Sequence, residues 1–238
     1  MNRFRFTTVR ERRGFTLLGW GVLSGALATL VILFILAIYP FLAPTQPVQG
    51  QVLVVDQVLS SGYMLTKARD RFQDGNYQLL VASSGGRLPE LPPAICKLVE
   101  TCRDGHLSQY KTKAQLNAAT LAAQGVPPEK IIEASAPSVQ KDRTYAAALE
   151  VKKQLDEKGL FPASLDVVSL GAHSRRTWII YQMVFSPETQ IGVYSIRSHA
   201  YDPERWWSSS AGVRTIIGET IAYLYARLIF NPPGSREN

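Results

Sequence analysis

The residues best suited to chemistry lie in the stretch 166–177, where an apolar run ends at a glycine and a histidine and two arginines follow. If residues 167–170 form a buried strand, then His173, Arg175 and Arg176 stand at its carboxyl end, where open α/β sheets bind their ligands. A histidine exchanges protons near neutral pH, and the planar arginine fork suits phosphate or carboxylate. The stretch therefore predicts an anion site in which His173 is a candidate general acid or base.

Only one of the two arginines is expected to face the ligand, because neighbouring residues on a helix point about 100° apart. A second loop could add to the site. Ser83, Ser84, Gly85 and Gly86 follow the apolar run 79–82, and the glycines allow backbone amides to turn toward an oxyanion. A Gly-Gly pair is also typical of a plain turn, so both interpretations stay open.

Further candidates follow other apolar runs. Asp142, Arg143 and Thr144 begin a predicted helix, where unpaired amides favour an anion, although Asp142 would also serve as a simple cap. Asp56 could act as a base, a metal ligand or a ribose partner, or only as a turn former. His199 follows the last predicted strand, at the same edge of the sheet. We take His173 and Asp56 as candidate catalytic residues and the others as candidate ligand-binding residues.

The elements that would position these residues alternate along the chain. The apolar patterns predict strands at 51–55, 79–82, 130–134, 167–170 and 190–196. They predict helices at 63–72, 113–124, 143–158, 174–184 and 214–230, with Ser174 as a plausible N-cap of the fourth. Alternation of this kind predicts an α/β fold in which a mostly parallel sheet is covered by helices on both faces, a three-layer sandwich.

A long uncharged segment precedes this domain. The sequence has no charged residue from Gly14 to Val55, and 15–43 exceeds the roughly 20 apolar residues that span a bilayer. A cleaved signal peptide is the alternative, but its apolar region should be about 7 to 15 residues long, so we predict a retained anchor. Five arginines precede the anchor and should stay in the cytoplasm, which places the domain in the periplasm or outside the cell. They are Arg3, Arg5, Arg10, Arg12 and Arg13.

Composition limits the remaining choices. The 238 residues are 46% hydrophobic and 19% charged, which suits one domain with an attachment. Much of the net charge of +7 comes from the N-terminal arginines, so nucleic acid is not an expected partner. We divide the chain into a cytoplasmic segment 1–14, an anchor 15–43, a linker 44–50, a domain 51–230 and a flexible tail 231–238.

The two cysteines, Cys96 and Cys102, lie six positions apart in one loop. Outside the cytoplasm the expected state of such a pair is a disulfide, and the alternative is two free thiols. His106 is close in sequence, but a fourth ligand is lacking and the spacing fits no common zinc pattern, so no metal is predicted. The last helix has two open interpretations: it packs against the sheet, or it lies on the membrane with Trp206 and Trp207 at the headgroups.

Several short motifs follow one another in a characteristic order across residues 51–230. They are the Ser83 to Gly86 loop, Gly125-Val-Pro-Pro-Glu-Lys-Ile131, Asp142-Arg-Thr-Tyr145, Ala172-His-Ser-Arg-Arg176, Tyr201-Asp-Pro-Glu-Arg-Trp-Trp207 and Gly218-Glu219. Together they resemble the bacterial SanA/ElyC/YdcF-like family, and the last two resemble its membrane-anchored branch. The resemblance implies a Rossmann-like sheet and a role in the cell envelope, in barrier function or in peptidoglycan or lipid-carrier metabolism. It also favours Arg176 over Arg175 as the arginine that faces the ligand.

The resemblance has two departures. The segment 56–61 lacks the glycine-rich turn that often follows the first strand in that family, and Arg143 stands where many members carry asparagine. A cytoplasmic relative binds S-adenosylmethionine, but these departures argue against a simple transfer of a nucleotide role, so the cofactor is left unknown.

Two classes of function therefore remain. The first is an inner-membrane envelope protein that binds a phosphate- or carboxylate-bearing ligand and acts on it, with a lipid-linked or peptidoglycan precursor as a candidate substrate. The second is a non-catalytic scaffold or ligand sensor, and a nucleotide- or S-adenosylmethionine-binding enzyme is a further alternative. Whether the protein is an enzyme and which proteins it contacts do not follow from the sequence.

Overall fold

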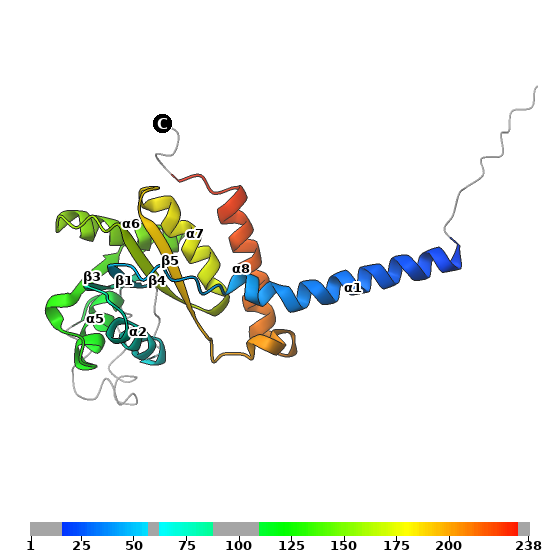
Figure 1. Ribbon diagram of the computed structural model, residues 1–238, viewed down its shortest axis with the longest axis horizontal. Coiled ribbons are helices and arrows are strands. Elements are labelled where there is room, and N and C mark those ends of the chain that lie inside the picture. The colour runs from blue at the N-terminus through cyan, green and yellow to red at the C-terminus, as the bar shows by residue number, and fades with distance from the viewer. Residues whose placement is uncertain (1–15, 57–61, 88–109, 233–238) are drawn as a thin grey trace, which may run out of the picture. The chain divides into compact units, whose positions relative to one another are not determined.

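The computed structural model describes residues 16–56, 62–87 and 110–232 (Figure 1). The chain divides into two compact units, Met1–Ile38 and Tyr39–Asn238. Most of helix α1 (Leu17–Leu42) lies in the first unit, and its last turn belongs to the second. Its 26 residues rise about 39 Å at 1.5 Å per residue, more than the hydrocarbon core of a bilayer. By length and composition this helix could span a membrane.

The second unit is built on a sheet of five parallel strands in the order β3-β2-β1-β4-β5 (Figure 1). The strands are β1 (Val52–Val55), β2 (Leu79–Gly85), β3 (Ile131–Ala136), β4 (Ser164–Leu170) and β5 (Gln190–Ile196). All four residues of β1 are buried, as expected of a central strand covered on both faces. The strand order reverses between β1 and β4, so the carboxyl ends of these two strands form the topological switch point of a Rossmann-like sheet.

Helices cover both faces of this sheet. The helices are α2 (Gly62–Asp74), α5 (Lys113–Ala123), α6 (Arg143–Glu157), α7 (Ser174–Val184) and α8 (Ser210–Leu228). One buried core joins the sheet to α6, α7 and the residue Ala226 of α8, and a second core joins it to α2 and α5. Figure 1 shows the two pairs α6/α7 and α2/α5 on opposite sides of the sheet. The predicted three-layer α/β fold is therefore confirmed.

Short 3₁₀ segments complete the described elements: η2 (Pro128–Lys130), η3 (Gly171–His173) and η4 (Pro203–Ser208). The predicted strands and helices all occur, with shifts of a few residues at their ends. The largest shifts are at β2, which extends three residues beyond 79–82, at β4, which begins three residues before 167, and at α8, which begins four residues before 214. Strand pairing with β3 accounts for the extension of β2, because Ser83, Ser84 and Gly85 pair in register with Ala134 to Ala136.

The predicted linker 44–50 is bound to the sheet and is part of the second unit. Gln46 exchanges two backbone hydrogen bonds with Val193 of β5, at 2.8 and 3.0 Å. The buried carboxylate of Asp166 then accepts hydrogen bonds from the amides of Val48 at 2.8 Å and Gly50 at 2.9 Å. The hydroxyl of Tyr77 donates to the same carboxylate at 2.8 Å. Asp166, which opens the chemically richest stretch of the sequence, therefore fixes the linker and lies outside the candidate site.

Most of the predicted flexible tail 231–238 lies outside the described residues, as do three further sequence predictions. These are the disulfide between Cys96 and Cys102, the loop after Asp56 at 57–61, and the cytoplasmic placement of the N-terminal arginines.

Candidate functional site

Asp56 and His173 meet at the switch point of the sheet. Asp56 directly follows β1, and its amide donates to the Val168 carbonyl of β4 at 3.1 Å. A 3₁₀ turn follows β4. It begins at Gly171, which has a left-handed φ of 49°, and ends at His173. The His173 Nε2 atom lies 3.9 Å from Asp56 Oδ2. The sheet thus brings together the two residues that the sequence singled out as candidate catalytic groups.

The Asp56 carboxyl is almost fully buried, at 2% exposure. Thr177 Oγ1 donates to it at 3.3 Å and the Tyr181 hydroxyl donates at 3.4 Å, both from α7. Burial raises the pKa of Asp56 to about 6, because a charge is costly away from water, and His173 and the hydrogen bond from Thr177 only partly offset this. A carboxyl with such a pKa exchanges protons close to physiological pH.

Arg176 is held by a set of contacts that spans three helices. Its Nε and Nη2 atoms donate to the two oxygens of Glu219 in α8, at 2.9 and 3.1 Å. Its Nη1 atom donates to Thr144 Oγ1, in the first turn of α6, at 3.0 Å. Burial would raise the pKa of Glu219, but hydrogen bonds from His173 and Arg176 outweigh it and lower this pKa to about 2. Glu219 is therefore a carboxylate throughout the physiological range.

The same contacts orient the His173 ring. Its Nδ1 atom lies 2.8 Å from Arg176 Nη2 and 3.2 Å from Glu219 Oε1. A guanidinium only donates hydrogen bonds and a carboxylate only accepts them, so Nδ1 accepts from Arg176 in one tautomer and donates to Glu219 in the other. The ring thus has a carboxyl group on each side, Asp56 near Nε2 and Glu219 near Nδ1.

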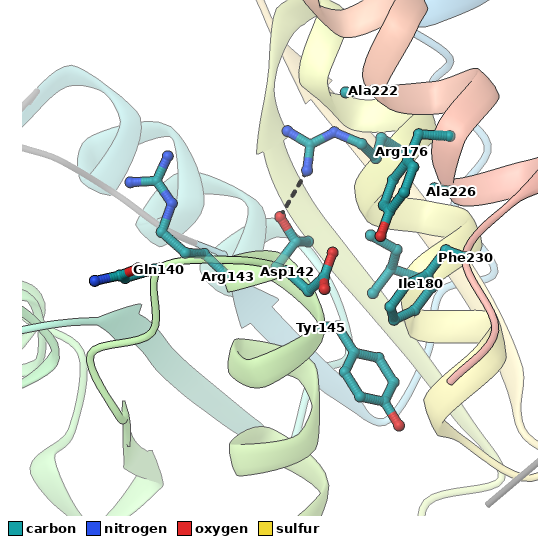
Figure 2. A pocket seen from close by; sticks show the side chains of 11 residues that line it. Gln140, Asp142, Arg143, Tyr145, Arg176, Ile180, Ala222, Ala226 and Phe230 are labelled. Atoms are coloured by element: carbon teal, nitrogen blue, oxygen red, sulfur yellow. Dashed lines mark hydrogen bonds between the residues drawn. The ribbon is translucent and has the colours of Figure 1, made fainter. Parts of the chain in front are cut away.

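A cavity of about 270 Å³ adjoins this cluster. Figure 2 shows the Arg176 side chain reaching from α7 toward the first residues of α6, while Ile180 and Phe230 lie next to each other farther along the wall. The polar lining comes from Arg176 and the start of α6. The apolar lining comes from α7, α8 and the residues after α8, and consists of Ile180, Ala222, Tyr225, Ala226 and Phe230. The cavity can therefore accept a polar group at one part of its wall and hydrocarbon at another.

The start of α6 differs from the predicted cap. Asp142 occupies the N-cap position with a left-handed φ of 53°, but its side chain accepts no hydrogen bond from the helix. Asp142 therefore occupies the predicted N-cap position, but the predicted capping hydrogen bond is absent, because the left-handed backbone turns the side chain away. Gln140, Asp142, Arg143 and Thr144 line the cavity at this helix start. Backbone amides in the first turn of a helix attract anions.

The Ser83 to Gly86 loop is more regular than predicted. Ser83 and Ser84 are buried within β2, and Gly85 ends that strand. The Gly86 amide donates to the Ala136 carbonyl at 3.3 Å, and its φ of 88° is left-handed. Because this amide continues the pairing of β2 with β3, it is not turned toward a ligand in the way that the sequence suggested.

Three other candidate positions lie apart from the cluster or act differently. Arg175 points away from the cavity: its guanidinium carbon lies 4.1 Å from the centre of the Phe41 ring, and its Nε donates to the Phe41 carbonyl. His199 stacks edge-on against Tyr63 at a centroid distance of 4.2 Å. Ser174, expected to cap the fourth helix, is instead the first residue of α7, after a cap position at His173 that has no side-chain hydrogen bond.

Three residues of the cluster were not among the sequence candidates: Glu219, Thr177 and Tyr181. Thr177 and Tyr181 follow Arg176 by one and five positions, so they share the helix that places Arg176. Glu219 is the only acidic residue in the α8 segment 210–228. A single carboxylate in a largely apolar helix could have indicated Glu219 as a candidate site residue. Within the part of the chain that the structure describes, no group of three His, Cys, Asp or Glu residues is placed to hold a metal ion.

Comparison with models of known protein families gives no match for this chain, and a search of curated proteins gives none either. The fold and the site define the class of protein by themselves. It is a parallel α/β protein with Rossmann-like strand order, whose switch point carries a linked Asp56, His173, Arg176 and Glu219 cluster beside a cavity.

Proposed function

We propose that this protein binds a phosphate- or carboxylate-bearing ligand in the cavity at the start of α6. The observation that carries the proposal is the composition of the cavity wall, which combines Arg176, Arg143 and the first turn of a helix whose N-cap side chain forms no capping hydrogen bond. An oxyanion placed there would meet helix amides and the Arg176 guanidinium group, with the positive charge of Arg143 at the same helix start.

The two arginines contribute differently to this binding. Arg176 is 20% exposed and is already paired with Glu219, so it offers a fixed donor geometry and little net charge. Arg143 is exposed, and within the described residues it has no ion-pair partner. We therefore assign to Arg143 most of the electrostatic attraction for the ligand, and to Arg176 its orientation.

The apolar part of the cavity supports a ligand that carries hydrocarbon next to its anionic group. Ile180, Ala222 and Phe230 line this part, and a simple inorganic anion would leave it empty. A lipid-linked precursor has the required combination of groups. Together with the anchor-like helix α1 and the resemblance to the SanA/ElyC/YdcF-like family, this favours a membrane-anchored envelope protein with its α/β domain outside the cytoplasm.

A second candidate function is acid–base catalysis by His173, which does not line the cavity but contacts Arg176, a residue of the cavity wall. The observation that favours it is the position of His173 between Asp56, 3.9 Å away, and Glu219, 3.2 Å away. His173 would move a proton at Nε2, while Glu219 and Arg176 hold its other ring nitrogen. A non-catalytic sensor would use the cavity in the same way without any turnover.

The binding proposal is tested on the full chain in detergent micelles by calorimetric titration with inorganic phosphate. We expect Arg143→Gln to weaken phosphate binding by about tenfold, the effect of one charge-assisted hydrogen bond. Lys158→Gln, a matched loss of charge just beyond the other end of α6, should leave the affinity unchanged. Equal affinities in both variants and the wild type would exclude the start of α6 as the anion site.

A further inference from the structure

The exposed face of α8 is apolar along three turns. Ile217, Ile221, Leu224 and Leu228 follow one another at helical spacing and are 52%, 63%, 46% and 74% exposed. The opposite face packs inward through Gly212, Ile216 and Ala226. One face of α8 thus serves the fold, and the other presents large aliphatic side chains to the surroundings. We call these four residues the α8 stripe.

The α8 stripe lies on the helix against which the end of α1 is packed. Residues 39–42 form the last turn of α1 and belong to the same compact unit as α8. The Phe41 ring contacts the Tyr223 ring of α8 edge-on, at a centroid distance of 5.3 Å. The Arg175 guanidinium lies over the Phe41 ring, and Leu42 is fully buried. The position where the chain leaves α1 is therefore fixed next to α8.

We propose that the α8 stripe lies on the surface of the bilayer that α1 spans, with its side chains among the lipid headgroups and upper acyl chains. This inference rests on the proposed membrane anchoring. If α1 spans the bilayer, Phe41 lies at its edge, and the Phe41 contact with Tyr223 holds α8 at the same level. A helix with an apolar face held at that level is expected to bury this face in the interface.

The flanks of the stripe suit lipid headgroups. Arg214, one turn before Ile217, and Arg227 are the basic residues of α8, and both are exposed. Trp207, in the 3₁₀ segment before α8, is 44% exposed, and tryptophan favours the membrane interface. The same helix supplies Ala222, Tyr225 and Ala226 to the cavity wall. A membrane-bound α8 would therefore bring the cavity close to lipid-linked ligands.

The test uses the full chain with Cys96→Ser and Cys102→Ser, reconstituted in vesicles of phosphatidylcholine and phosphatidylglycerol. A single cysteine is introduced by Leu224→Cys in the stripe, by Leu149→Cys on the exposed side of α6, or by Leu27→Cys within α1, and is labelled with an environment-sensitive fluorophore. Spin-labelled lipids should quench the labels at 224 and 27 at least about twofold more than the label at 149.

The three labels separate failure of this inference from failure of the anchor. Strong quenching at 27 with quenching at 224 no greater than at 149 would leave the anchor intact and overturn the docking of α8. Weak quenching at all three positions would overturn both. Concentration-dependent crosslinking through position 224, without quenching there, would assign the stripe to a second copy of the chain and also overturn the inference.

Discussion

The guanidinium group of Arg176 and the carboxylate of Glu219 form a two-point pair, with Nε to Oε2 at 2.9 Å and Nη2 to Oε1 at 3.1 Å. This pair links α7, which follows the central strand β4, to α8, the last helix of the described chain. It also holds the Nδ1 side of His173, since both partners lie within 3.2 Å of that atom. A single contact between distant segments thus sets the geometry of the candidate site.

The first prediction concerns the stability that Glu219 provides. Its pKa falls from the ordinary value of 4.5 to about 2 on folding, so its contribution is complete above pH 4.5 and is lost as the pH falls through 2. We expect Glu219→Gln to lower the free energy of unfolding at pH 7 by about 2 to 4 kcal/mol. Urea unfolding of the full chain in micelles measures this, and a variant as stable as the wild type at pH 7 would contradict it.

The second prediction concerns Asp56, whose pKa shifts on folding in the opposite direction to that of Glu219. Its pKa rises from 3.8 to about 6 on folding, so its contribution to stability is greatest below pH 3.8 and is lost as the pH rises through 6. Asp56→Asn keeps a neutral side chain of the same shape. We therefore expect the change in the free energy of unfolding caused by Asp56→Asn to be up to about 3 kcal/mol more favourable to the folded state at pH 7 than at pH 4.

Unfolding curves for Asp56→Asn and the wild type at pH 4, 5, 6 and 7 give this difference. A difference that does not change across this pH range would show that the carboxyl of Asp56 has an ordinary pKa in the folded protein.

The sequence predicts the parts of the site that depend on local pattern. His173 and Arg176 follow an apolar run that is predicted to be a strand, so their place at the sheet edge follows from chain order and the rules for parallel sheets. Asp56 is placed by the same reasoning after β1. The choice of Arg176 over Arg175 follows from helix geometry together with the family resemblance, and the structure places Arg176 at the cavity and Arg175 against Phe41.

The parts that the sequence could not give depend on distant packing. Glu219 lies 43 residues after Arg176, and nothing local indicates that α8 crosses to reach it. The left-handed backbone of Asp142 and the pairing of Gly86 with Ala136 are set by neighbouring elements, so the capping and anion-loop predictions could not foresee them. Asp166 begins the stretch 166–177 that carries the predicted site, but its carboxylate accepts hydrogen bonds from the linker amides of Val48 and Gly50.

Asp166 provides a test of that structural role. Asp166→Ala removes the acceptor for the part-buried amide of Val48 and the buried amide of Gly50, which costs about 3 to 5 kcal/mol. We expect faster hydrogen exchange at 46–50 and a lower unfolding midpoint. Tyr77→Phe, which removes only the third hydrogen bond, should cost about 1 kcal/mol. Unchanged exchange at 46–50 in Asp166→Ala would exclude Asp166 as the residue that fixes the linker.

The proposed orientation in the membrane gives another prediction. A reporter enzyme that is active only outside the cytoplasm, fused after Asn238, should be active, because the five N-terminal arginines favour the cytoplasmic side. A second reporter that is active only in the cytoplasm serves as the matched control and should be silent. The reverse result would place the α/β domain in the cytoplasm and remove the envelope part of the proposal.

The most direct test of the anion site is to locate the bound anion by nuclear magnetic resonance on the full, isotope-labelled chain in micelles. On titration with inorganic phosphate, we expect saturable shifts in the backbone amide signals of Arg143, Thr144 and Tyr145 and in the Nε signal of Arg176. The amides of α5, on the other face of the sheet, should not move. Shifts that leave the start of α6 and Arg176 unchanged, or that appear only elsewhere, would contradict the assignment of this cavity as the ligand site.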